Sequence, residues 1–197
     1  DGRLEAFQAR IVDSELGRLR AAQIVDHAIR TPNQRLELLP PVGVYYNALR
    51  IERSALDRYV ASLNSQAAIE LAKGSEADQK ALWINAYNAL VLRTIIDHFP
   101  IRGRASEYPA SSIRQIPGAF DKAQHRVAGR AVSLDAIEME ILAPIGDARV
   151  FLALGRGAQG GGRLRSEAFD GPTIEKLLEA AAAEAVARPQ IVRVDSA

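Results

Sequence analysis

The sequence contains no cysteine and only three histidines among its 197 residues. Without a thiol the chain forms no disulfide, no thiolate metal site and no cysteine nucleophile. The histidines are His27, His98 and His125, and their scattered positions match neither an H-x-x-x-H nor an H-E-x-x-H spacing. These absences exclude thiol chemistry and argue against a zinc site, and we expect neither a metal nor a cofactor.

The chain also lacks a charge excess and a long apolar run. It has 25 basic and 24 acidic residues, which give a formal net charge of +1, and no basic block that could follow a nucleic-acid backbone. No apolar run approaches the roughly 20 residues that a membrane span requires. We therefore expect no nucleic-acid partner and no membrane span. The chain begins at Asp1 without a signal-peptide pattern, as is typical of a processed or trimmed form.

Helical spacing of apolar residues dominates the sequence, which is long enough for one domain with a sizeable core. Residues 1–43 are predicted as a helical segment and a connector. Further helices are predicted over 54–63, 76–98, 133–142 and 173–187. Ser54 and Ser133 are the predicted N-caps of two of them. The window from Trp83 to Ile96 is nearly all apolar, so we expect the helix over 76–98 to be central.

Short strands complete the predicted pattern. A hairpin is expected over 125–132, and single strands over 44–46, 150–154 and 191–194. No internal repeat is visible. The prediction is a single α+β domain, rich in helix and with a small sheet, in which residues 44–197 pack together with the N-terminal segment.

Two asparagines lie inside the apolar window. Asn85 and Asn88 are three residues apart, so their side chains share one helical face. An unpaired buried amide costs about 1–3 kcal/mol, and each asparagine therefore needs hydrogen-bond partners. The structural interpretation is that both amides bond the region 133–155 and hold it on the helix. The functional alternative is that they orient a catalytic group or bind a ligand.

Two blocks of the sequence resemble a known family. The block WINAYNAL at 83–90, which contains Tyr87, is similar to the signature helix of the domain of unknown function 547 family. The block VSLDAIE at 132–138 resembles the second motif of that family, and Glu138 and Arg149 are its retained charged positions. The resemblance covers about residues 44–195.

The chain departs from that family where the family has polar residues. Where the resemblance implies histidine, this chain has Met139 and Phe151, and where it implies arginine, it has Ala143. The two cysteines of the family, the second followed by proline, correspond to Arg156 and to the glycines at 161 and 162. If the family positions form a papain-like core with a nucleophilic site, this chain cannot carry out that chemistry.

A glycine-rich loop with nearby arginines follows the predicted strand at 150–154. Its sequence, GRGAQGGGRLR over 155–165, satisfies the weak dinucleotide pattern G-x-G-x-x-G, but the helix that must follow the third glycine is missing. A nest of backbone N–H groups with Arg156 and Arg163 would suit a small anion. The favoured alternative is a flexible surface loop with solvated arginines, in which replacing Arg156 has little effect.

Glu138 and Arg149 have a structural and a functional interpretation. They either line a pocket or form a structural ion pair. The catalytic alternative is general acid–base catalysis by Glu138 together with Asp135, which lies three residues earlier. His98 and His125 are interpreted as structural.

The sequence supports two hypotheses. The first is a noncatalytic family member, a pseudoenzyme that serves as a binding or structural module for an unknown protein partner; the resemblance favours an exported or cell-envelope bacterial protein. The second is a binder of a small anionic or phosphate ligand, or a divergent hydrolase, that uses the glycine-arginine loop and Glu138. No catalytic residue is assigned. The candidate binding residues are Asn85, Tyr87, Asn88, Glu138, Arg149, Arg156 and Arg163.

Overall fold

The computed structural model describes residues 44, 46–157, 162, 164–165 and 167–188. The predicted N-terminal helical segment, the predicted strand at 191–194 and Arg163 lie outside the described residues. In chain order the elements are α4 (Tyr46–Ile51), α5 (Ser54–Ser62), α6 (Gln66–Leu71), α7 (Glu76–Asp97), η1 (Ile113–Gln115), β1 (His125–Val127), β2 (Arg130–Val132), α8 (Leu134–Ala136), η2 (Ile137–Leu142), η3 (Ala143–Ile145), α9 (Arg149–Ala153), η4 (Gly171–Thr173) and α10 (Ile174–Val186).

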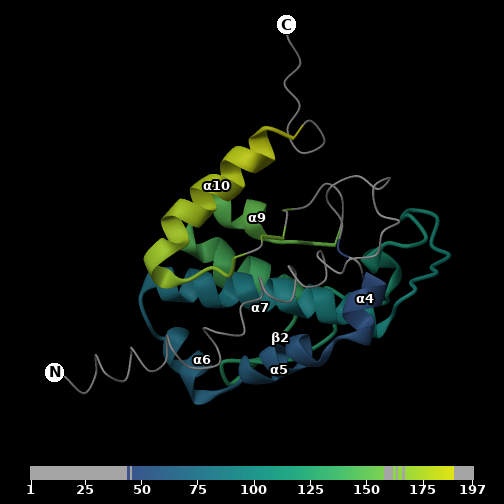
Figure 1. Cartoon of the computed structure of the whole chain (residues 1–197), viewed down its shortest axis with the longest axis horizontal. Helices are drawn as coiled ribbons and strands as arrows, with labels where there is room; N and C mark the ends of the chain where they lie inside the picture. Colours follow the sequence, from purple (N-terminus) through teal and green to yellow (C-terminus); the bar gives the residue numbers. More distant parts are fainter. Residues whose placement is uncertain (1–43, 45, 158–161, 163, 166, 189–197) are drawn as a thin grey trace, which may run out of the picture.

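The central element is α7, as predicted. Residues 80–92 of this helix are all buried, and a helix buried on every side requires protein around it. Figure 1 shows α7 running through the middle of the molecule, with α5 and α6 along one side and α9 and α10 along the other. A capping box fixes its start, because Ser75 and Asp78 each accept a hydrogen bond from the other's backbone N–H.

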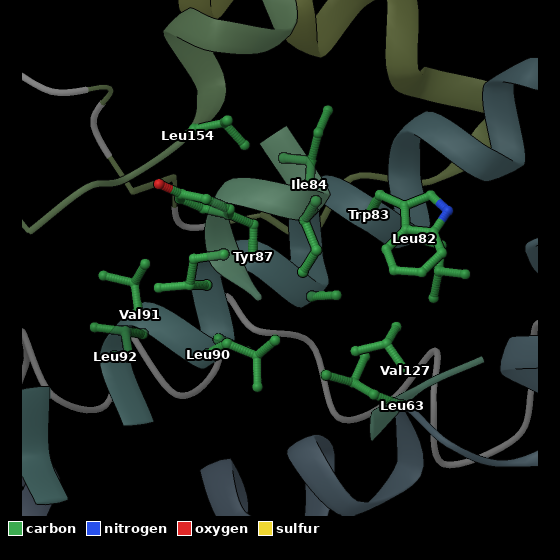
Figure 2. Close-up of a cluster of buried hydrophobic side chains, with 14 of the residues drawn as sticks. Leu63, Leu82, Trp83, Ile84, Tyr87, Leu90, Val91, Leu92, Val127 and Leu154 are labelled. Carbon is green, nitrogen blue, oxygen red and sulfur yellow. The ribbon is translucent and has the colours of Figure 1, made fainter. Parts of the chain in front are cut away.

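The hydrophobic core surrounds α7. Trp83 and Tyr87 are among its largest fully buried side chains. Figure 2 shows that side chains from well-separated parts of the sequence, among them Leu63, Val127 and Leu154, gather beside those of α7. This single core is consistent with one domain.

The predicted hairpin at 125–132 is confirmed. β1 and β2 pair antiparallel, and the turn residues Ala128 and Gly129 have positive φ values of 50° and 78°, which suit a two-residue hairpin turn. The Ala128 N–H donates to the carbonyl of Leu63 at 2.8 Å, and the Gly129 N–H donates to Oδ1 of Asn64 at 2.8 Å. The end of α5 therefore holds the turn in place.

The prediction of a helix-rich α+β domain with a small sheet is confirmed. Within the described part of the chain the sheet consists of β1 and β2. None of the helices described there has the length and hydropathy of a membrane span.

The predicted strand at 150–154 is wrong, because residues 149–153 form α9. Asp147 Oδ1 accepts the Arg149 N–H at 3.1 Å at the start of this helix. Val150 and Ala153, three residues apart, are both buried, as expected of one helical face. An apolar run of five residues fits a buried strand and a buried helical turn equally well, so sequence periodicity cannot separate them.

Two smaller predictions also need correction, and a third is confirmed with a change of helix type. Tyr46 begins α4 instead of lying in a strand. The N-cap of α5 is Arg53, whose side chain bonds Asp57, so Ser54 lies one position inside the helix. Ser133 caps its helix as predicted, but the helix turns from α to π geometry at Ile137.

The two asparagines of α7 are buried, and the side-chain amide of each donates one hydrogen bond and accepts another, but they bind different segments. The Asn88 amide donates to the carbonyl of Ala153 at 3.1 Å, and its Oδ1 accepts the Gly155 N–H at 2.7 Å. This confirms the prediction that Asn88 holds the region 133–155. The corresponding prediction for Asn85 is wrong, because its amide bonds the backbone C=O and N–H of Phe169 at 2.7 and 3.1 Å.

Replacing Asn88 by alanine should lower the free energy of unfolding by about 1–3 kcal/mol, because it leaves the buried N–H of Gly155 and the C=O of Ala153 without a partner. Urea denaturation monitored by circular dichroism measures the change. The control is Asn47→Ala, which removes an exposed amide and should change the value by no more than about 0.5 kcal/mol. Equal stability of the two variants would contradict a structural role of Asn88.

Candidate functional site

Three of the candidate residues meet at one place. Glu138 on η2 accepts hydrogen bonds at Oε2 from the Tyr87 hydroxyl and from Arg156 Nε, both at 3.3 Å. Its Oε1 forms a short ion pair with Arg156 Nη2. The guanidinium also donates from Nη1 to the carbonyl of Phe151 at 3.4 Å. We call Tyr87, Glu138 and Arg156 the Glu138 cluster.

Each member of the Glu138 cluster is placed by a different part of the fold. The ring of Tyr87 is completely buried in the core, and Figure 2 shows its hydroxyl at the edge of the hydrophobic side chains. Glu138 lies in the π-helical turn of η2, a type of distortion that is frequent at functional sites. Arg156 follows Gly155, whose N–H is held by Asn88. The cluster therefore depends on the central helix for two of its three positions.

Two glycines allow the chain around Arg156 to lie against the core. A Cβ atom at Gly155 would come within 2.7 Å of Leu164 Cδ2, and one at Gly157 within 2.7 Å of Ile95 Cδ1. Gly157 also has a φ of 65°, which is unfavourable for other residues. Glycine at these positions therefore serves close packing.

The surroundings of the cluster keep the tyrosine neutral and the arginine charged. Burial raises the pKa of Tyr87, and the charge of Glu138 raises it further. Burial alone would lower the pKa of Arg156, but the hydrogen bond to Glu138, the charge of Glu138 and the contact with Tyr87 together outweigh this effect, and the pKa is raised. At neutral pH a phenol and a guanidinium thus both donate to Glu138, whose side chain is only 15% exposed.

The prediction of solvated arginines is wrong for Arg156 and Arg165, the two loop arginines that the structure describes. Gly155 is buried, and Arg156 is paired with Glu138. The Gly162 N–H donates to the carbonyl of Leu154 at 3.1 Å. Arg165 lies 3.5 Å from a carboxylate oxygen of Glu167.

Because α9, not a strand, precedes the glycines, the dinucleotide pattern also lacks its structural context.

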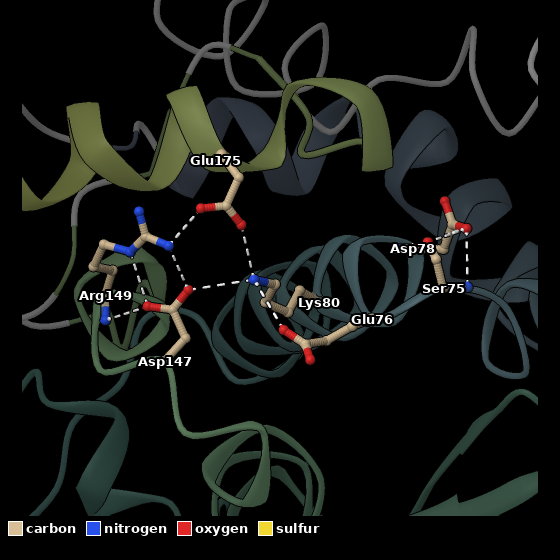
Figure 3. A network of polar contacts seen from close by, with 7 residues as sticks. All are labelled: Ser75, Glu76, Asp78, Lys80, Asp147, Arg149 and Glu175. Atoms are coloured by element: carbon tan, nitrogen blue, oxygen red, sulfur yellow. Dashed lines mark hydrogen bonds and ion pairs between the residues drawn. The ribbon is translucent and has the colours of Figure 1, made fainter.

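Arg149 belongs to a separate network, which Figure 3 shows. Its guanidinium lies 2.8 Å from Asp147 and 2.6 Å from Glu175, so the alternative of a Glu138–Arg149 ion pair is not what the structure contains. Lys80 of α7 is buried and contacts the same two acids at 3.3 and 3.0 Å. Burial alone would lower the pKa of Lys80, but the hydrogen bonds to Glu175 and Asp147 and the charges of these two acids together outweigh it and raise the pKa. This network joins α7, α9 and α10.

The structure thus divides the candidate residues. It brings Tyr87, Glu138 and Arg156 together, with Asn88 supporting the adjacent backbone, and it places Asn85 and Arg149 in other contacts. Within the described residues no group of three His, Asp or Glu side chains could hold a metal ion. Sequence reasoning missed a cleft lined by His98 and His125 on the side of α7 that faces α5. No motif indicated it, because the cleft needs three segments that are far apart in the sequence.

Comparison with known proteins identifies one family. Residues 71–185 match the family described as "Protein of unknown function, DUF547". No curated protein and no solved structure matches the chain. The finer expectation of a papain-like core therefore stays a prediction.

The ion pair of the Glu138 cluster should be measurable in a double-mutant cycle. For Glu138→Gln and Arg156→Met we expect a coupling free energy on the order of 1 kcal/mol, reduced from the buried limit because the Arg156 side chain is 29% exposed. Denaturation of the two single variants and the double variant gives the value. The control cycle combines Arg156→Met with Glu140→Gln. Glu140 is an exposed acid of the same helix, so this pair should show no coupling. A coupling free energy of zero for the first pair would contradict the ion pair and would mean that Arg156 is solvated instead.

The Arg149 network should make stability depend on pH in the acid range. A hydrogen bond from Arg149 lowers the pKa of Asp147 to about 2. A carboxylate with a lowered pKa in the folded state stabilises the protein above its ordinary pKa, and this contribution is lost as the pH falls through the folded value. The difference in unfolding free energy between the wild type and Asp147→Asn should therefore be constant above about pH 5 and shrink towards pH 2. A difference that stays the same down to pH 2 would contradict this assignment.

Proposed function

The chain belongs to the DUF547 family, and on that premise we propose that it is a noncatalytic member that serves as a binding or structural module. The observation that carries the proposal is the Glu138 cluster. A carboxylate that acts as a general base needs a free oxygen within reach of the proton that it removes. Both oxygens of Glu138 are instead occupied by Arg156 and Tyr87.

The family resemblance supports the same conclusion from another direction. Arg156 stands where the family has a cysteine, and the carbonyl of Phe151, at a family histidine position, accepts a hydrogen bond from it. Met139, at the other histidine position, is 62% exposed. Because the sequence contains no cysteine at all, a thiolate nucleophile is excluded. We infer that the ion pair of Glu138 and Arg156 now ties η2 to the chain after α9.

A divergent hydrolase is the second candidate function. Asp135, the second acid that such a hydrolase would use with Glu138, gives it little support. Asp135 is exposed and lies in the first turn of α8, where an acid stabilises the helix N-terminus. An anion site at Arg156 would have to compete with Glu138 for the same guanidinium. Both alternatives therefore require the ion pair to open.

A turnover screen tests the proposal. The purified wild type, Glu138→Gln and Glu140→Gln should be compared on chromogenic esters, amides, phosphate esters and glycosides, after thermal melting has established that each variant is folded. We expect that the wild type has no activity that depends on Glu138, so that Glu138→Gln and the wild type give the same result on every substrate. Turnover in the wild type and in Glu140→Gln that is absent from Glu138→Gln would establish a catalytic carboxylate and overturn the noncatalytic role.

A further inference from the structure

A long loop joins α7 to η1. Residues 98–112 form neither a helix nor a strand, and Figure 1 shows them in teal at the right edge of the molecule. Residues 104–111 are all exposed. Loops longer than roughly 12 residues without secondary structure are uncommon in compact domains, and the ordered ones usually serve binding or another function. This loop therefore does more than connect two helices.

The side chain of Gln115 orders the loop. Its Oε1 accepts the Ala105 N–H at 3.0 Å, and its Nε2 donates to the carbonyls of Ala105 and Tyr108, both at 2.8 Å. The Gly103 N–H donates to the carbonyl of Ala110 at 2.8 Å and so closes the loop on itself. A Cβ atom at Gly103 would collide with the side chain of Gln115. The exposed residues of the loop are thus held in one arrangement.

Arginines and a tyrosine form the surface that this loop presents. Arg102, Arg104 and Arg114 are exposed, and none of them forms an ion pair within the described part of the chain. The guanidinium of Arg114 lies 5.8 Å from the ring centroid of Tyr108 and 5.0 Å from that of Phe120. Tyr108 is 38% exposed. Tyrosine and arginine are enriched among the side chains that contribute most to protein–protein binding. The loop therefore offers positive charge beside an accessible aromatic ring.

The charges of the loop favour an acidic peptide over a nucleic acid. Glu107 is the one acid among residues 98–115, and it is exposed between the arginines. A nucleic acid carries a negative charge at every phosphate, so Glu107 would repel it. Acidic side chains of a peptide can pair with Arg102 and Arg104 without contacting Glu107. Three arginines also make a smaller basic surface than a nucleic acid requires.

We propose that residues 98–115 form the docking surface for an acidic segment of a partner protein. Carboxylates of that segment pair with Arg102 and Arg104, and an apolar side chain beside them packs against Tyr108 and Arg114. The docking surface rests on the proposed role of the chain as a binding module and gives the chemistry of the partner. It shares no residue with the Glu138 cluster, so its failure would leave the noncatalytic role, which the turnover screen tests, standing.

Matched peptides test the charge requirement. A fluorescein-labelled peptide of aspartate and glutamate residues around one central phenylalanine should be titrated with the full chain by fluorescence anisotropy, at pH 7 and low ionic strength. Its counterpart of asparagine and glutamine is measured alongside. We expect the acidic peptide to bind at least tenfold more tightly, and added salt to weaken it because ions screen exposed charges. Equal binding of the two peptides, or no binding of the acidic one at submillimolar protein, would overturn the proposal.

Variants of two arginines locate the site. Arg102→Gln combined with Arg104→Gln should weaken binding of the acidic peptide by tenfold or more. The melting temperature should not change, because both side chains are exposed and unpaired among the described residues. The control combines Arg58→Gln with Lys73→Gln, two exposed positions outside the loop, and removes the same amount of charge. It should bind as the wild type does. Equal binding by the two double variants would overturn the assignment.

Two further variants separate the ordered loop from general charge attraction. The wild type should prefer the peptide with the central phenylalanine at least threefold over one with alanine there, and Tyr108→Ala should abolish this preference without changing any charge. Gln115→Ala also keeps every charge, and it should weaken binding at least threefold while thermal melting shows that the chain is folded. A preference that survives Tyr108→Ala would overturn the proposed contact, as would wild-type binding by Gln115→Ala.

Other polyanions test the class of the partner. Oligothymidylate and vesicles that contain phosphatidylserine should bind more weakly than the acidic peptide at the same ionic strength. Tighter binding of either one, lost when Arg102→Gln and Arg104→Gln are combined, would overturn the assignment of an acidic protein segment and indicate a nucleic acid or a membrane surface instead.

Discussion

The buried surface of α7 is the constraint on which the rest of the structure depends. Residues 80–92 have no exposed side, so each polar group among them must find its partner inside the protein. Lys80, Asn85 and Asn88 each have partners between residues 147 and 175, and Lys80 also pairs with Glu76 of α7 itself. The apolar residues of α7 drive its burial, and the polar ones specify which segments cover it.

The candidate site follows from this constraint. Asn88 holds the N–H of Gly155 at 2.7 Å, and the next residue is Arg156, whose guanidinium then meets Glu138. Gly155 and Gly157 allow the backbone to come close enough to the core for this contact. The backbone at Gly155 is thus part of the packed interior, and the chain returns to the surface at Gly157.

Sequence reasoning succeeded where a pattern is sustained or strictly local. The long apolar window predicts α7, and the positive φ of Gly129 suits the glycine in the predicted hairpin turn. It failed at α9, because five apolar residues do not distinguish a helix from a strand.

The pairs of the candidate site were harder to predict because they join distant positions. Nothing in the sequence connects Asn85 with Phe169, which lies 84 residues later. Glu138, which pairs with Arg156, lies in the π-helical turn of η2, and local propensity does not reveal such a turn. One signal was present: glycine permits a close approach of the backbone, and a glycine stands on each side of Arg156.

Hydrogen exchange at the backbone N–H of Gly155 tests most directly whether this segment belongs to the core. The N–H is bonded to a buried asparagine, so it should exchange only through openings that also expose α7. Its protection should therefore approach that of the α7 amides, which report the global stability of the fold. Exchange at the rate of an unstructured peptide would contradict the central claim that Asn88 fixes this segment, and with it Arg156, onto the central helix.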